Sequence, residues 1–240
     1  MIAIPTSLWL HYAGDAAAWL LAFLGARWVY RHRRQSVSTL AAQTEPGYFL
    51  ALAAGGVLGA WLAGSLNSLR FAFPTPSHSI AGALAGAIVA VEIWKWRVGL
   101  RQSTGGPFVI PLTIGIVAGR WGCLFAGLGD GTYGTPTSLP WAVDLGDHIG
   151  RHPVQLYESL TMAVFLAVYW RALIGERGWA VRHGFHAFVL VYAVQRFVWE
   201  FLKPYPSLLG PLNLFHLLMI GLAAYALAWI ARDARRPVTG

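Results

Sequence analysis

The sequence predicts an all-α membrane protein in which seven transmembrane helices form a single polytopic domain over residues 1–240. The first observation is composition: 56% of the 240 residues are hydrophobic and only 12% are charged, whereas an ordinary soluble domain carries about 25% charged residues. So few charges cannot cover a folded globule of this length, which excludes a typical soluble enzyme and a disordered chain. The other two observations are a set of long apolar segments and a one-sided distribution of basic residues.

Seven segments are long and apolar enough to cross a bilayer, which takes about 20 mostly apolar residues. Most of the 13 prolines fall between these segments, where helix ends are expected. The predicted spans are Leu8–Tyr30, Gly47–Leu66, His78–Trp96, Pro107–Gly127, Val154–Gly175, Gly184–Leu202 and Pro211–Arg232.

The basic residues orient these spans, because cytoplasmic connections carry an excess of Lys and Arg. One set of connections and ends holds Arg27, Arg31, Arg33, Arg34, Lys95, Arg97, Arg101, Arg171, Arg177, Arg182, Arg232, Arg235 and Arg236, and the opposite set holds only Arg70, Arg151 and Lys203. This asymmetry predicts an N-terminus outside and a cytoplasmic C-terminus. The net charge of +8 then reflects topology and contact with anionic lipid, so we expect no nucleic-acid partner.

The single cysteine, Cys123, cannot form an intrachain disulfide, and no Cys/His set has the spacing of a zinc site. We therefore expect no metal. The first eight residues lack a basic stretch, so we expect no cleaved signal peptide.

Ionisable side chains inside spans are costly and usually face the bundle interior or a water-filled cavity. The predicted topology places nearly all of them, together with the polar Gln195, in the outer half of the membrane: His11, Tyr12, Asp15, His78, Arg120, Tyr157, Glu158, Arg196, Glu200 and His216. Glu92 is the exception, since it lies near the inner end beside Lys95 and indicates an ion pair at the inner surface. The polar chemistry of the chain is thus expected at its outer side.

Two arginines at one depth predict an anion site, most simply for a phosphate. Arg196 shares a helix face with Tyr192 and Glu200 through its i−4 and i+4 spacing, and Arg120 lies in another span at a similar depth. Arginine stays charged when buried and offers a planar fork of donors. The alternative is that Arg196 and Glu200 merely cancel each other's charge.

A glycine-rich stretch follows Arg120 and runs through Gly134. Glycine allows backbone to approach a ligand closely, so we expect a looped segment at the edge of a site, although a simple helix exit would look the same. The long connection 131–153 is interpreted as a lid or an acceptor-docking loop, or else as a passive loop.

Three ordered motifs resemble the bacterial prolipoprotein diacylglyceryl transferase family. The first is Gly119-Arg120-Trp121-Gly122 with its glycine-rich turn. The second is Arg151-His152-Pro153-Val154-Gln155-Leu156-Tyr157-Glu158, and the third is Tyr192-Ala193-Val194-Gln195-Arg196 followed by Glu200-Phe201. The resemblance covers most of the chain, from His11-Tyr12 to the last span.

The resemblance implies transfer of the diacylglyceryl group of phosphatidylglycerol to the lipobox cysteine thiol of a prolipoprotein, with release of glycerol phosphate and no cofactor. It also implies a multi-pass protein of the bacterial inner membrane. Carried over by motif, Arg120 and Arg196 would hold the phosphate, and a neutral histidine would take the thiol proton. The residues expected to bind substrate are Tyr12, Tyr192, Glu200, Cys123, Asp130, His152, Gln155, Tyr157 and Glu158.

The chain departs from the family pattern at two places. Ala81 stands where the family has histidine, so His78, about one helical turn earlier, is predicted as the substitute base. Cys123 stands where the family has asparagine; it is interpreted as a nucleophile or as a small packed residue. These departures leave two alternatives open: a related lipid-modifying enzyme with another acceptor, and a non-catalytic lipid-binding protein.

Overall fold

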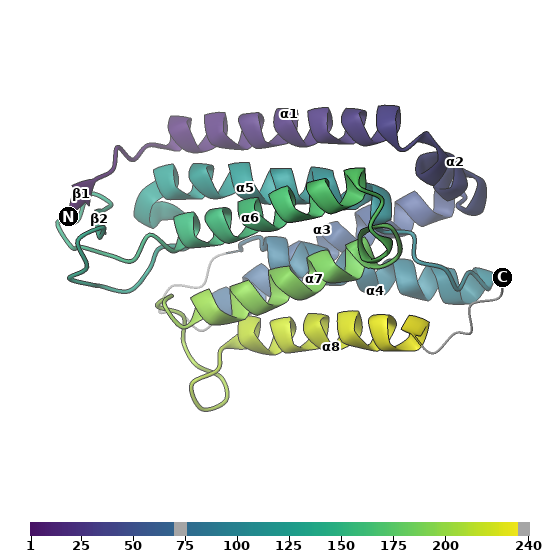
Figure 1. Ribbon diagram of the computed structural model, residues 1–240. Helices are drawn as coiled ribbons and strands as arrows, with labels where there is room; N and C mark the ends of the chain where they lie inside the picture. Colours follow the sequence, from purple (N-terminus) through teal and green to yellow (C-terminus); the bar gives the residue numbers. More distant parts are fainter. Residues whose placement is uncertain (70–75, 235–240) are drawn as a thin grey trace.

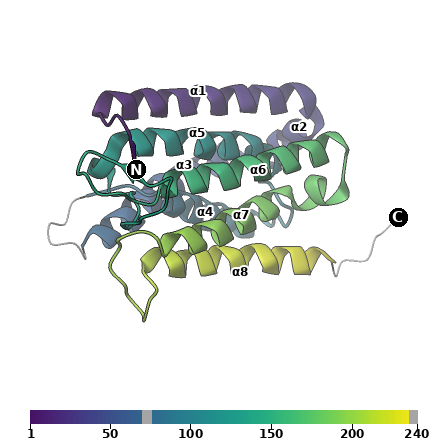
Figure 2. The same cartoon turned by 60° about the vertical axis from the view of Figure 1, so that its left-hand side comes forward.

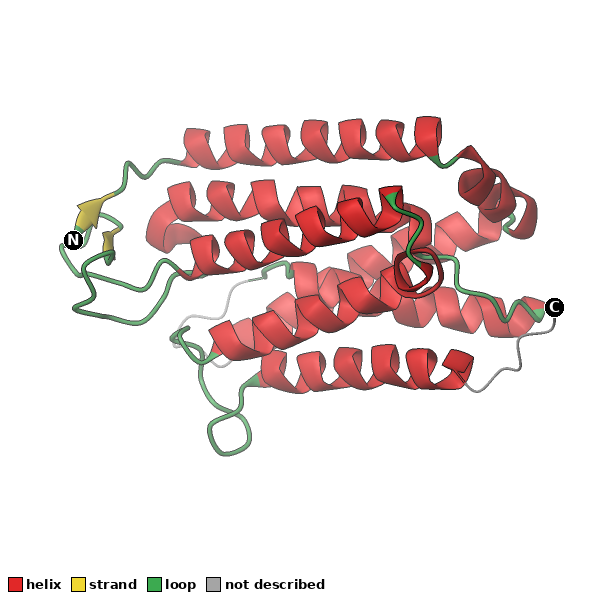
Figure 3. Cartoon of the chain, in the orientation of Figure 1, coloured by secondary structure: helices red, strands yellow, loops and turns green. Residues whose placement is uncertain are grey.

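The computed structural model describes residues 1–69 and 76–234, and its long helices run side by side in one bundle (Figures 1 and 2). Short strands and loops gather at the end that holds the N-terminus (Figure 3). In order, the elements are β1 (Ile2–Ala3), α1 (Leu8–His32), α2 (Arg34–Gln43), α3 (Pro46–Ser68), α4 (Ile80–Val98), η1 (Gly106–Phe108), α5 (Val109–Ala126), η2 (Gly127–Asp130), β2 (Val143–Asp144), α6 (Val154–Ile174), α7 (Gly178–Glu200) and α8 (Leu214–Ala234).

Each predicted span falls on one long helix, so the all-α prediction is confirmed. The largest boundary difference is in α7, which begins at Gly178, six residues before the predicted start. Within the described ranges, Pro46–Ser68, Gly106–Asp130 and Leu214–Asp233 are long and apolar enough to cross a membrane by length and composition. The protein is thus an all-α membrane protein, while the count of seven spans stays a prediction.

Helix α2 was not predicted. Its ten residues carry few large apolar side chains, and of them only Leu40 is buried. A helix of this composition gives no span-like signal, because its residues are too polar and too few to cross a bilayer. It lies at the end of the bundle opposite the N-terminus (Figure 1).

Glycines bring two helix pairs into close contact. A Cβ added to Gly59 of α3 would lie 2.3 Å from the carbonyl oxygen of Gly82 in α4, and one added to Gly14 of α1 would lie 2.6 Å from Cα of Gly122 in α5. No larger residue fits at such positions without moving the backbone. Close packing through small residues is the usual way in which helices associate in lipid.

Large apolar side chains cover much of the outside of the bundle. On α1, Trp9 and Trp19 are 82% and 79% exposed, and on α6 Leu160 and Val164 are also exposed. In water such a surface would promote aggregation. It is the surface expected of helices that face hydrocarbon.

The two ends of the bundle differ in their connections. The end with the N-terminus holds the ends of α5 and α7 and the starts of α6 and α8, and the other end holds α2 and the end of α8 (Figure 1). Of the basic residues assigned to the two faces from the sequence, Arg70, Arg235 and Arg236 lie outside the described residues.

The 131–153 connection is anchored to the N-terminus. Strand β1 pairs in parallel with β2, with Ile2 opposite Val143 and Ala3 opposite Asp144. Within the connection, the backbone N–H groups of Val143 and Arg151 each donate to the other residue's carbonyl oxygen. The segment is therefore a structured cap over the end of the bundle that holds the N-terminus.

Candidate active site

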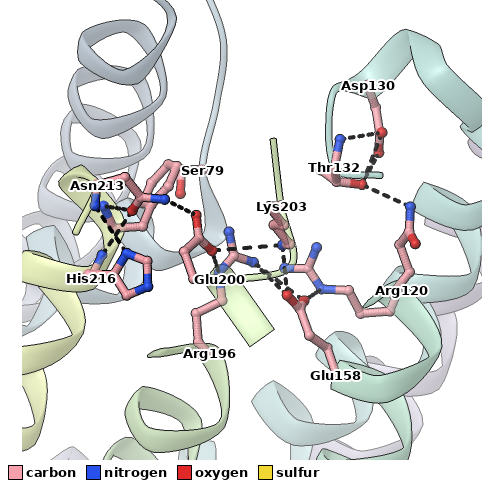
Figure 4. A network of polar contacts seen from close by, with 12 residues as sticks. Ser79, Arg120, Asp130, Thr132, Glu158, Arg196, Glu200, Lys203, Asn213 and His216 are labelled. Atoms are coloured by element: carbon pink, nitrogen blue, oxygen red, sulfur yellow. Dashed lines mark hydrogen bonds and ion pairs between the residues drawn. The ribbon is translucent and has the colours of Figure 1, made fainter. Parts of the chain in front are cut away.

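A cluster of buried charges joins three helices at the N-terminal end of the bundle (Figure 4). Its centre is the carboxylate of Glu158 on α6, which is 1% exposed. Arg120 Nε of α5 lies 2.6 Å from Oε2, Arg196 Nη1 of α7 lies 3.2 Å from Oε1, and Lys203 Nζ, just after α7, donates to Oε1 at 2.7 Å. One carboxylate thus contacts three cations.

The cluster continues through Glu200 on α7. Arg196 Nε lies 2.9 Å from Glu200 Oε2, so the two residues that the sequence places on one helix face form an ion pair. Asn213 Nδ2 donates to Glu200 Oε1 at 3.2 Å, and Asn213 Oδ1 accepts the backbone N–H groups of Phe215 and His216. Asn213 therefore caps the start of α8 and ties it to the cluster.

The charges in this cluster do not cancel. Arg120, Arg196 and Lys203 contribute three positive charges against two negative charges from Glu158 and Glu200, which leaves a formal net charge of +1. All five side chains are at most 5% exposed. A buried net charge is costly unless another group compensates it, so the cluster is suited to hold one more anion.

The donor geometry supports the same conclusion. The Nε–H groups of Arg120 and Arg196 lie close to carboxylate oxygens but do not form hydrogen bonds with them. The hydroxyl of Tyr192, which is buried on α7 one turn before Arg196, has no hydrogen-bond partner in the described part of the chain. Buried donors usually have partners, so the Tyr192 hydroxyl remains available to a ligand, whereas each arginine Nε–H already faces a carboxylate.

The comparison with family models matches residues 16–232 to the prolipoprotein diacylglyceryl transferase model. The chain belongs to the prolipoprotein diacylglyceryl transferase family. This confirms the resemblance that the three sequence motifs indicated.

Curated relatives of this transferase family agree. A phosphatidylglycerol–prolipoprotein diacylglyceryl transferase of Coxiella burnetii is 31% identical over 247 aligned positions, which cover 95% of this chain and 91% of the relative. The enzyme of that name from Methylobacillus flagellatus is 34% identical over 141 positions, covering 57% of this chain and 52% of the relative. No solved structure matches this chain.

The residues of the second predicted motif lie in two adjacent regions of this transferase, one beside the charge cluster and one beside the 131–153 loop. Gln155 is buried beside the cluster, and its Nε2 donates to Thr132 Oγ1 at 3.4 Å. Tyr157 lies nearer the loop, where its hydroxyl accepts from Trp141 Nε1 at 2.8 Å and approaches His152 Nδ1 at 3.5 Å. His152 and Tyr157 thus lie on the side of the cap, and within the described residues no hydrogen bond or ion pair joins them to the charged side chains of the cluster.

Cys123 and Asp130 lie near the cluster on the side of Arg120. The half-buried thiol of Cys123 is within electrostatic reach of both Arg120 and Asp130. Asp130 accepts hydrogen bonds from the backbone N–H and the hydroxyl of Thr132. Gly127 begins the looped segment with a φ of +68°, which a glycine adopts without strain.

Two predicted site residues lie away from the cluster. His78 precedes α4 and is exposed, and Tyr12 is 58% exposed on α1, where its ring contacts Trp9 and His11. Among residues 1–69 and 76–234, no hydrogen bond or ion pair joins either side chain to the five charges. The position that holds histidine in the family pattern is filled here by Ala81, which is buried.

Sequence reasoning missed two members of the cluster as site residues. Lys203 was counted with the outer connections, although its i+3 spacing from Glu200 was a usable signal. Asn213 gave no signal, since a single asparagine before a helix reads only as a cap. Within the described ranges, no group of three or more His, Cys, Asp or Glu side chains is placed to hold a metal ion.

The acidic residues of the cap have pKa values below their usual range. Hydrogen bonds from the backbone N–H groups of Gly146 and His148 lower the pKa of Asp144. The Arg151 guanidinium, which donates to Asp147 Oδ2 at 2.5 Å, lowers the pKa of that carboxyl. The ionised carboxylates therefore help to hold the cap in its fold.

Proposed function

We propose that this protein transfers the diacylglyceryl group of phosphatidylglycerol to the cysteine thiol of a prolipoprotein lipobox and releases glycerol phosphate. The names of its curated relatives state this donor and this acceptor. The observation that carries the proposal is the buried cluster with three cations and a net charge of +1. A phosphodiester headgroup supplies the anion that the cluster lacks.

The proposed reaction forms one bond and breaks one. The thiol sulfur attacks the glyceryl methylene carbon of the donor, and the bond from that carbon to a phosphate oxygen breaks. The electron pair leaves with glycerol phosphate, so a phosphodiester of charge −1 becomes a monoester that can reach −2. Arg120 and Arg196 would stabilise the growing charge, because preorganised donors in a site without water act most strongly where charge develops.

The reaction also needs an acceptor for the proton of the attacking thiol. The sequence predicts His78 as its acceptor, but this side chain is exposed at the outer end of α4. The departing phosphate monoester can itself take the proton, since its second ionisation lies near pH 6. Turnover of His78→Ala separates the two routes: a loss of about 100-fold or more supports the histidine, and unchanged turnover supports the phosphate.

We further propose that the seven long helices all span the bacterial inner membrane, with the N-terminus outside, the C-terminus cytoplasmic and residues 1–240 forming one domain. The uneven distribution of basic residues supports this orientation. It places the charge cluster in the outer leaflet. A reporter active only in the cytoplasm should work when fused after Gly240 and fail when fused before Met1.

The activity can be tested with purified protein, phosphatidylglycerol and a synthetic lipobox peptide, by measuring released glycerol phosphate. We expect Arg120→Ala and Arg196→Ala each to lower the rate by about 10²–10³-fold. Arg97→Ala is the matched control, since this arginine is exposed in the last turn of α4. Equal rates in all three variants would contradict the proposal.

A second candidate is a related lipid-modifying enzyme with another acceptor. It is favoured by Ala81 and Cys123, which replace family residues on the proton-transfer side. Release with a different thiol or hydroxyl acceptor, but none with the peptide, would establish it. Stable lipid binding without release for any acceptor would instead indicate a non-catalytic lipid-binding protein.

A further inference from the structure

An apolar cavity of about 270 Å³ lies between α3, α4, α5, α7 and α8. Its lining includes Ile116, one helical turn before Arg120, and Phe188, one turn before Tyr192. The rings of Phe188 and Tyr192 stack with centroids 6.2 Å apart. The cavity therefore begins directly inward of the charge cluster.

The length of the cavity follows from α4, which lines it from end to end. The lining residues of α4 recur at helical spacing from Ile80, in its first turn, through Ala87 to Glu92. The twelve steps from residue 80 to residue 92, at 1.5 Å each, give about 18 Å. One leaflet of a bilayer has a hydrocarbon thickness of about 15 Å, so the cavity matches the length of one lipid chain.

Four polar side chains close the inner end of the cavity, and we call them the polar floor: Tyr48, Glu92, Thr104 and Tyr225. Tyr225 donates its hydroxyl to Glu92 Oε1 at 2.9 Å, and Tyr48 donates to Thr104 Oγ1 at 3.0 Å. Lys95 Nζ donates to the same Glu92 oxygen at 2.8 Å. This confirms the predicted ion pair but corrects its place, because Lys95 is only 2% exposed.

We propose that this cavity holds one acyl chain of the donor lipid and that the polar floor sets the longest chain that the protein accepts. The proposal rests on the proposed function, which brings a diacyl lipid to the charge cluster. It goes further by assigning chain-length selection to the inner end of α3, α4 and α8.

The physical reason is the contrast between the walls and the floor. A chain gains little by moving from lipid into an apolar cavity, because both surroundings are hydrocarbon. A methyl end that reaches the floor must displace hydrogen bonds to a charged carboxylate, which costs about tenfold or more in binding. Glu92 and Tyr225 also line a second groove beside α4, so these two side chains stand between the cavity and that groove.

Gly56 offers a site where the cavity can be shortened without a clash. A Cβ added to Gly56 would meet nothing nearer than 3.9 Å, in contrast to Gly55, where the nearest atoms would lie at 2.5 Å. Gly56→Leu therefore places a side chain in the cavity. Gly221→Leu on α8 is the matched control, since Gly221 is exposed and a Cβ there meets nothing within 4 Å. Leu52→Ala, at the inner part of the lining, lengthens the cavity instead.

The test measures kcat/KM with phosphatidylglycerols that carry two identical saturated chains of stepped length. We expect Gly56→Leu to lower the ratio of long-chain to short-chain kcat/KM about tenfold. Leu52→Ala should move the longest accepted chain upward, and Gly221→Leu should keep the wild-type profile. If all variants share that profile, the cavity does not select chain length and the proposal is overturned.

A second measurement separates this proposal from the proposed function. Detergent-purified protein is exposed to an equimolar mixture of the same lipids, and the retained species are identified by mass spectrometry. If wild type retains a defined range of lengths that Gly56→Leu shortens, the cavity assignment holds even when no lipid is turned over. Retention of all lengths equally by wild type and Gly56→Leu would overturn it.

Discussion

Glu158 is predicted to be the residue on which the stability of the charge cluster depends most. The change Glu158→Gln keeps the shape of the side chain and removes its charge. It leaves Arg120, Arg196 and Lys203 without the carboxylate that lies 2.6–3.2 Å from each of them. The formal net charge of the cluster then rises from +1 to +2 in a site that is nearly closed to water.

The size of the effect follows from known buried ion pairs. Removing one partner of such a pair costs about 3–5 kcal/mol, because the remaining charge stays buried without compensation. For a chain of about this length, each kcal/mol lowers the melting temperature by about 2–4 °C. We therefore expect Glu158→Gln to melt about 6–20 °C below wild type.

The assay is thermal unfolding of the detergent-purified protein, followed by the fluorescence of its 12 tryptophans. Glu176→Gln is the control, because its side chain is 80% exposed and pairs with Arg33 only at 3.6 Å. Exposed pairs contribute about 0–1 kcal/mol, so this variant should melt within about 4 °C of wild type. If Glu158→Gln has the same melting temperature as Glu176→Gln, the three buried cations do not depend on the Glu158 carboxylate for stability, and the prediction is wrong.

Three further predictions concern the donors and the cap. Arg196→Lys keeps the charge but cannot contact both carboxylates, so we expect glycerol phosphate release to fall at least about tenfold; an unchanged rate would show that charge alone suffices. Tyr192→Phe removes a hydroxyl without a described partner, so melting should stay within about 2 °C while KM for the donor rises; a large loss of stability would refute this. The folded cap lowers the pKa of Asp144 and Asp147. The two ionised carboxylates therefore stabilise the cap fully above the pKa of aspartate in the unfolded chain, which is about 4, and this stabilisation is lost as the pH falls below that value. Amide exchange in residues 131–153, corrected for intrinsic rates, should rise in that range, and Asp144→Asn should weaken the dependence.

Most of the helices could be predicted from the sequence because the lipid bilayer imposes one constraint on the segments that cross it. A helix must be long and apolar to cross a bilayer, so Leu8 to Tyr30 and its six counterparts stand out as continuous segments. Helix α2 could not be predicted in this way, since it contains no long apolar segment. Lys95 was expected near the surface, but the structure buries it against Glu92 and the ring of Trp229, 4.7 Å away.

The site was predictable only in part. The spacing of Arg196 and Glu200 on one helix fixes their contact locally, and the ion pair is present. The contact of Arg120 with Glu158 joins two helices across 38 positions, and no local rule specifies it. His186, near the start of α7, shows the same limit: it is buried against Trp229, with ring centroids 4.9 Å apart, and no local sequence pattern indicates this contact.

The most direct test of the role of the cluster is the mass of a lipobox peptide after incubation with phosphatidylglycerol and purified protein. We expect wild type to add one diacylglyceryl group to a peptide that contains cysteine and none to the matched peptide that contains serine. Arg120→Gln, shown to be folded by its tryptophan melting curve, should leave the cysteine peptide unmodified. Modification of that peptide at the wild-type rate by folded Arg120→Gln would contradict the assignment of the donor phosphate to the buried cluster.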